Sequence, residues 1–154
     1  MTQALYMSGN ILYVPARNLR NPIQTEFLAA EGFVFYQIRH GEEKVPEQWS
    51  SEPYVILLEM EAFDPEFIRN VPQFRAALGA YRIPILALVG PTRLPLPQEA
   101  IRQEAEALDS GIDAYLQKPI SFTRLVARLR VLLRRTPTPS NPLYSCQHAP
   151  TIPR

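Results

Sequence analysis

The stretch YVILLEM, residues 54–60, decides the fold of this chain. It is the most hydrophobic run in the sequence, and its apolar residues follow one another without a polar residue between them until Glu59. Continuous rather than alternating hydrophobicity is typical of a strand in a parallel sheet, because helices cover both faces of such a sheet. We therefore predict a central buried strand here, with Glu59 close to its carboxyl end.

Four more short apolar runs predict further strands. They are residues 11–14, 33–38, 83–90 and 113–117. Stretches with apolar residues at helical spacing separate the strands and predict five helices, at residues 22–31, 42–51, 65–78, 98–110 and 121–135. Asn21 and Pro22 suggest the cap and the first residue of the first helix. Pro72 is expected to break or kink the third helix.

Strands that alternate with helices in this way predict an α/β fold. Right-handed crossovers favour a doubly wound, five-stranded parallel sheet of the flavodoxin-like kind, with strand order 2-1-3-4-5. In such a sheet a site is expected beyond the carboxyl ends of the first and third strands. The residues at those ends are Pro15, Ala16, Glu59 and Met60.

Length and composition indicate one compact domain. Of the 154 residues, 46% are apolar and 20% are charged, which is ordinary for a globular protein. The net charge of +1 gives no overall field that would draw the chain to nucleic acid or to a membrane. The sequence contains a single cysteine, no secretory signal and no apolar run of roughly 20 residues. We expect a cytoplasmic protein with no disulfide and no membrane partner.

The predicted elements and the proline-rich end divide the chain into three segments. We expect an N-terminal extension at residues 1–9, the folded domain at residues 10–135 and a tail at residues 136–154. The tail is rich in proline, serine and threonine, so it has little apolar surface to offset its ordering entropy. It is either a disordered end or a linker to an output domain. No metal site is expected, because His40, Cys146 and His148 lack further ligands at zinc-site spacing.

Landmarks along residues 10–135 resemble, in order, the receiver domains of response regulators (CheY-like). ALDSGIDAYLQKPIS, which begins at residue 107, resembles the fifth strand of that family, with Lys118 and Pro119 at its lysine and proline. Tyr115 stands at the aromatic switch position of the family. RLVARLRVLLRR resembles the last helix of receivers that are joined to a winged-helix DNA-binding domain.

The remaining landmarks show where this sequence departs from the family. ILYV resembles the strand that leads to an acidic pair, and this places Pro15 and Ala16 at the acidic positions. VILLEMEAF places Glu59 at the position of the phosphoacceptor aspartate. IPILALVG resembles the fourth strand, and Val89 occupies the place of its threonine or serine.

These departures remove the chemistry of phosphoryl transfer. The reaction needs a divalent cation held by carboxylates, and neither Pro15 nor Ala16 can ligate one. Val89 cannot donate a hydroxyl hydrogen bond, and Glu59 carries its carboxylate one methylene further out than aspartate. We predict an ion pair between Glu59 and Lys118. Two interpretations stay open: Glu59 mimics a phosphorylated aspartate, or the pair only satisfies two partly buried charges.

Charge on the last two helices suggests a contact face. In the family, helix 4, strand 5 and helix 5 form a two-fold dimer face that pairs acids with arginines. The candidate residues for such a face here are Glu104, Asp109, Asp113, Arg124, Arg128 and Arg130. The alternative is two ordinary solvated helix faces, on which single ion pairs contribute little.

The resemblance implies a receiver domain that works without phosphorylation, through contact with itself or with another signalling protein. We expect no enzymatic activity. DNA would be contacted only through an output domain beyond residue 154. A flavin or nucleotide site is not expected, because PARNLRNP after the first strand has no glycine to cradle a phosphate. The remaining alternatives are phosphotransfer through Glu59 and an adaptor unrelated to transcription.

Overall fold

A computed structural model describes residues 9–17, 19–38, 54–78, 83–90 and 97–135. The predicted helix at 42–51, His40, Cys146, His148 and the tail at 136–154 lie outside these residues, as does the N-terminal extension apart from Gly9.

The core of the fold is a parallel sheet of five strands. The strands are β1 (Gly9–Pro15), β2 (Phe33–Gln37), β3 (Tyr54–Met60), β4 (Ile85–Val89) and β5 (Ala114–Gln117). Their order in the sheet is β2-β1-β3-β4-β5, and every pair is parallel. The predicted fold class and strand order are therefore confirmed. All of β3 is buried, as its continuous hydrophobicity predicts.

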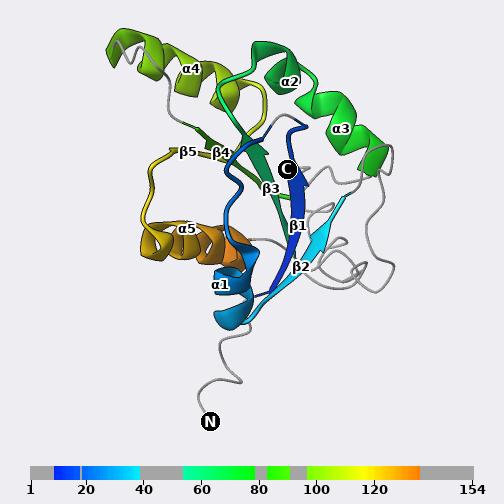
Figure 1. The fold of residues 1–154 in the computed structure, drawn as a ribbon. Helices are drawn as coiled ribbons and strands as arrows, with labels where there is room; N and C mark the ends of the chain where they lie inside the picture. Colours follow the sequence, from blue (N-terminus) through cyan, green and yellow to red (C-terminus); the bar gives the residue numbers. More distant parts are fainter. Residues whose placement is uncertain (1–8, 18, 39–53, 79–82, 91–96, 136–154) are drawn as a thin grey trace, which may run out of the picture.

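Helices cover both faces of this sheet (Figure 1). The helices are α1 (Thr25–Ala30), α2 (Pro65–Arg69), α3 (Val71–Leu78), α4 (Pro97–Asp109) and α5 (Phe122–Arg135). In Figure 1, α2, α3 and α4 lie above the sheet, and α1 and α5 lie below it. Alternate residues of each strand point to opposite faces, so two hydrophobic clusters form, one on each side. Among the described residues no helix is long and apolar enough to cross a membrane.

The proline at position 72 breaks the third predicted helix as expected. α2 ends at Arg69 and α3 begins at Val71, so Pro72 lies in the first turn of the new helix, where its missing N–H costs nothing. Asp64 caps α2 by accepting hydrogen bonds from the N–H groups of Glu66 and Phe67, at 3.1 and 3.3 Å.

The start of α1 differs from the sequence-based prediction. The helix begins at Thr25, after Gln24, and not at Asn21 and Pro22. The reason lies in the tertiary structure, because the backbone groups of residues 21 and 23 bond to the charged side chains of Lys118, which follows β5, and Glu59 in β3. These contacts belong to the site described below.

Arg75 of α3 bonds to the segments at the amino-terminal ends of β4 and β5. Its guanidinium donates to the carbonyl oxygen of Ile83, to that of Gly111 at 2.8 Å, and to the carboxylate of Asp113 at 3.2 Å. The same carboxylate accepts the N–H of Ile85 at 2.8 Å. One side chain therefore joins the helix to the segments that lead into β4 and β5.

Candidate functional site

The candidate site lies at the carboxyl ends of β1 and β3. Pro15 pairs with Glu59 in the sheet register, and the N–H of Ala16 donates to the Glu59 carbonyl at 2.8 Å. The side chain of Glu59 points to the α1 and α5 side, as those of Val55 and Leu57 do. Glu59 is 0% exposed, and a buried carboxylate requires partners that compensate its charge.

Three protein groups supply that compensation. Lys118 forms an ion pair with Glu59, as the sequence predicts. The Tyr13 hydroxyl donates to the same carboxylate. The N–H of Ile23 lies 3.2 Å from Oε1 and 3.1 Å from Oε2 of Glu59. Both carboxylate oxygens are thus bonded to groups of the chain itself.

Lys118 connects the carboxylate to two other segments. Its Nζ donates to the carbonyl oxygen of Asn21 at 3.0 Å, and its backbone N–H donates to the carbonyl oxygen of Val89 at 2.7 Å. The lysine side chain is 18% exposed, so it reaches water where Glu59 does not. The peptide bond between Lys118 and the exposed Pro119 is cis.

Tyr13 is a site residue that the sequence-based prediction missed. Burial raises the pKa of its phenol, and the hydrogen bond to Glu59 and the Glu59 charge raise that pKa further. The phenol therefore stays protonated and remains a donor to the carboxylate. The sequence did contain a sign of this contact. Tyr13 stands two residues before the end of its strand, on the face of the sheet that Glu59 shares, and a buried tyrosine hydroxyl usually has a hydrogen-bond partner.

The magnesium ion that the receiver fold implies does not fit this site. Pro15 and Ala16 have no oxygen on their side chains, and the remaining carboxylate is occupied by Lys118, Tyr13 and Ile23. Within the described ranges, no three His, Cys, Asp or Glu side chains gather into a metal-binding group. Magnesium prefers several oxygen ligands, and the Glu59 carboxylate already has an ammonium group as its counter-charge.

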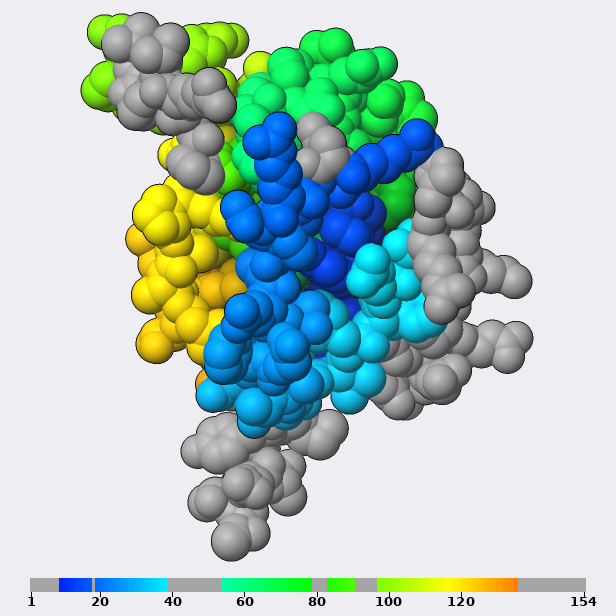
Figure 2. Space-filling view, viewed as in Figure 1, coloured from blue at the N-terminus to red at the C-terminus, as the bar shows by residue number. Residues whose placement is uncertain are grey.

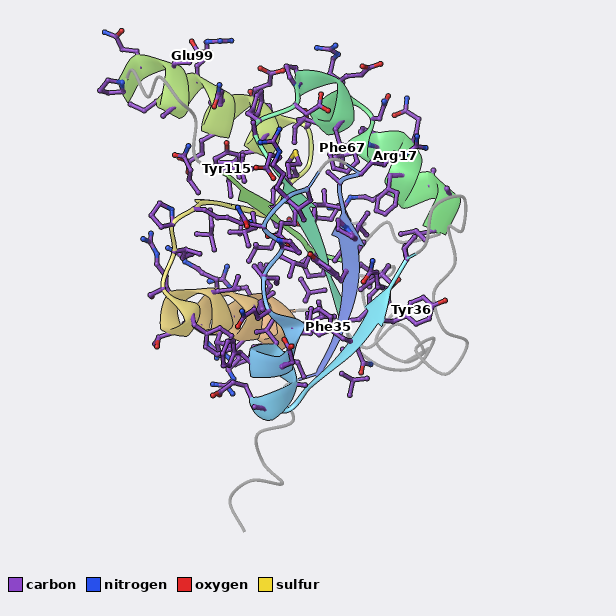
Figure 3. The ribbon with its side chains drawn as sticks, viewed as in Figure 1. Arg17, Phe35, Tyr36, Phe67, Glu99 and Tyr115 are labelled. Atoms are coloured by element: carbon purple, nitrogen blue, oxygen red, sulfur yellow. The ribbon has the colours of Figure 1, made fainter. Side chains whose placement is uncertain are left out.

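Two of the four predicted switch positions, Val89 and Tyr115, lie on the other face of the sheet from the carboxylate, whereas Lys118 binds it and Pro119 follows Lys118. Val89 is buried in the other hydrophobic cluster, with Met60 and Ile68. Tyr115 packs edge-on against Phe63, with ring centroids 6.5 Å apart, and lies on the α4 side of the sheet (Figure 3). Burial raises the pKa of Tyr115 to about 12, with a further contribution from the charge of Glu104.

A groove of about 440 Å³ runs between α4 and α5 over β5. Its wall on α4 includes Ile101, which is 68% exposed, and Leu108, which is 42% exposed. The lining residues are Ala100, Ile101, Glu104, Leu108, Asp113, Ala114, Tyr115, Leu116, Gln117, Ile120, Arg124 and Arg128. The groove is apolar along α4 and basic along α5. We call it the α4–α5 groove.

The structure separates the six charged residues of the predicted contact face. Glu104, Arg124 and Arg128 line the α4–α5 groove together, and Asp113 lines it while it is bonded to Arg75. Two others are placed elsewhere. Asp109 is exposed at the end of α4, outside the groove lining. Arg130 lies on the α1 side of α5.

The position of Arg130 follows from the helix geometry. Its guanidinium lies 3.1 Å from the Glu31 carboxylate and over the Phe33 ring, at 5.8 Å from the centroid. Arg124 and Arg128 are one turn apart and share a face, whereas Arg130 falls on the opposite side. Of the predicted contact residues, Glu104, Arg124 and Arg128 therefore line the groove together, and Arg130 does not.

Comparison with protein-family models gives no match for this chain. Among curated proteins, it is 29% identical to Protein RcaC of Microchaete diplosiphon over 125 residues, which are 81% of this chain and 18% of RcaC. It is 37% identical to Response regulator MprA of Mycobacterium sp. (strain KMS) over 60 residues, 39% of this chain and 23% of MprA. The chain thus spans less than a quarter of the length of these relatives.

Solved structures give the same fold over most of the chain. Full-length FixJ from B. japonicum superimposes with a TM-score of 0.54 at 16% identity, covering 94% of this chain and 65% of FixJ. A putative response regulator from Chloroflexus aurantiacus gives a TM-score of 0.54 at 20% identity, covering 82% of this chain and 98% of that protein. The chain has the CheY-like fold, and its structural neighbours and response-regulator relatives together support a receiver domain.

Proposed function

We propose that this chain is an atypical receiver domain that takes up no phosphoryl group and acts by protein–protein contact in signal transduction. The observation that carries the proposal is the occupied carboxylate of Glu59. A phosphoacceptor must present a free oxygen to the incoming phosphorus, with a metal ion to neutralise the phosphoryl charge. The Glu59 oxygens are bonded to Tyr13, Ile23 and Lys118, and the acidic-pair positions hold Pro15 and Ala16.

An amide NMR titration of the chain with magnesium and beryllofluoride, a mimic of the phosphoryl group, tests whether the site takes up a phosphoryl group. We expect no saturable shifts at Glu59, Val89 or Lys118, because neither the metal nor the mimic has a place to bind. A receiver domain that retains its acidic pair, titrated in the same buffer, is the positive control. Saturable shifts at these three residues would make Glu59 a working phosphoacceptor and would refute the proposal.

The α4–α5 groove supports a specific mode of contact, the two-fold pairing of two copies of this chain. In a two-fold interface the same patch serves both partners, so an acid and a base on one patch meet their opposites on the other. Glu104 on α4 and Arg124 and Arg128 on α5 meet this condition. Ile101 and Leu108 supply exposed apolar surface beside them.

Charge reversal tests the pairing. Sedimentation of the wild-type chain is expected to show a dimer, and Glu104→Lys or Arg128→Glu to weaken it about tenfold by placing like charges together. Mixing the two variants restores association, because each then supplies the charge that the other lacks. Glu66→Lys, an exposed change on α2, is the control. A wild-type chain that stays monomeric, or a mixture without rescue, would contradict the pairing.

The biological setting belongs to the same proposal. RcaC and FixJ are longer than this chain, and MprA is named a response regulator. We place the chain in two-component signalling and transcription control in the cytoplasm, either as a dimer or as an adaptor for another signalling protein. Contact with DNA would come only through an output domain joined beyond residues 136–154.

A further inference from the structure

The segment between β1 and α1 is held by three charged side chains, two at the end of β3 and one after β5. We call residues 20–23 the strap. Figure 2 shows the segment after β1, in blue, on the front of the molecule, with the yellow side that precedes α5 to its left and the green of α2 and α3 above it. Because the strap is neither helix nor strand, its backbone groups need partners from elsewhere.

Three backbone groups of the strap have such partners. The N–H of Arg20 donates to the carboxylate of Glu61 at 2.7 Å. The carbonyl oxygen of Asn21 accepts from Lys118 at 3.0 Å, and the N–H of Ile23 donates to Glu59 at 3.1 Å. Hydrogen bonds to charged groups are the stronger kind, so these contacts hold the strap against the end of the sheet.

The sequence of the strap favours a different local structure. Asn21 followed by Pro22 is a strong signal for an N-cap and a first helical residue. In a helix that begins at Pro22, the N–H of Ile23 would take the Asn21 side chain as its acceptor. In the structure that N–H donates to Glu59, and α1 starts only at Thr25. The Asn21 side chain and the Glu59 carboxylate therefore compete for one donor.

We propose that the strap is a two-state latch. In the closed state Glu59, Glu61 and Lys118 bind residues 20–23, and α1 begins at Thr25. In the open state Asn21 caps a longer α1 that begins at Pro22, and the Glu59–Lys118 pair is uncovered. The sequence favours a helix start at Asn21 and Pro22, whereas α1 starts at Thr25. Because the local preference and the tertiary contacts disagree here, we assign the strap as the segment that changes between the two states. The latch rests on these contacts alone, so the beryllofluoride result does not decide it.

Carbon-α chemical shifts of residues 22–24 report the latch in the full chain. Glu61→Ala removes the acceptor of the Arg20 N–H at a partly exposed position. Glu59→Gln keeps the size of the side chain but removes its charge, which weakens the contact with Ile23 and leaves Lys118, the partner of Asn21, without its counter-charge. Loss of a charged hydrogen bond shifts the open-to-closed ratio about tenfold or more. We expect the three shifts to move towards helical values in both variants. Glu66→Ala, which removes an exposed acid of α2, is the control.

Asn21→Ala identifies the cause of any such movement. It removes the side-chain cap but keeps the carbonyl group that Lys118 binds, so adding it to Glu61→Ala should return the shifts to their wild-type values. If the Asn21 side chain did not stabilise the longer helix, adding Asn21→Ala would leave the shifts where Glu61→Ala had moved them. The proposal is overturned if the shifts stay unchanged in both Glu61→Ala and Glu59→Gln, if they move towards random-coil values, or if Asn21→Ala does not reverse them.

Discussion

Replacing Lys118 with methionine is expected to lower the free energy of unfolding by about 3 kcal/mol. The ammonium group is the counter-charge of Glu59, which is fully buried, and methionine leaves that carboxylate with only neutral donors. Breaking a buried pair on one side is costly because the remaining charge cannot regain its hydration. The lower end of the usual range applies because the lysine side chain itself is 18% exposed. Urea denaturation of the two proteins measures the difference.

The partner variants make this prediction specific to the ion pair. Glu59→Gln should cost less, about 1–2 kcal/mol, because its carbonyl still accepts a hydrogen bond and Lys118 can turn to water. The double variant Glu59→Gln/Lys118→Met should cost less than the sum of the single changes, since no buried charge remains. Additive costs would mean that the two side chains do not stabilise each other.

Replacing Arg75 with methionine is the second large change, with an expected loss of about 2–4 kcal/mol. Methionine keeps the apolar stem but removes every donor of the guanidinium. The carbonyl oxygens of Ile83 and Gly111 and the carboxylate of Asp113 then lose a charged partner. Arg75 is 15% exposed, so water replaces those bonds poorly.

The same substitution on the surface provides the control for Arg75. Arg69→Met changes an exposed arginine in the last turn of α2, so it should alter the free energy of unfolding by no more than about 0.5 kcal/mol. Thermal denaturation of the three proteins compares the two positions. Equal effects at 69 and 75 would show that the bonds of Arg75 contribute nothing to stability.

The fold could be predicted from sequence because each strand is a short, continuous apolar run. YVILLEM and IPILALVG can be buried on both faces only in a covered parallel sheet, and proline or glycine marks several of the boundaries. Pro72 gave the division between α2 and α3 for the same reason, since its effect on the backbone is local. The strands and the helix break could be located because each depends on a few neighbouring residues in the sequence.

The site was predicted only in part, because its other contacts are tertiary. Glu59 and Lys118 could be paired from their positions in the sheet. The Tyr13 hydroxyl and the N–H of Ile23 join them from segments whose local patterns point elsewhere, to a plain buried strand and to a helix start. The structure places Arg130 on the side of α5 away from Arg128, because each residue of a helix turns by about 100° and the two positions are two residues apart.

The shortness of β5 has a consequence for how the protein avoids unwanted self-assembly. β5 is an edge strand that pairs with β4, and it runs only from Ala114 to Gln117. Open edges invite other chains to add a strand, and very short edges are one way in which proteins resist fibril growth. So short a strand offers few backbone groups for hydrogen bonds with an added peptide strand. A protein that enters the groove above β5 must therefore be selected by its side chains, so binding there can be specific without turning the sheet into a template for aggregation.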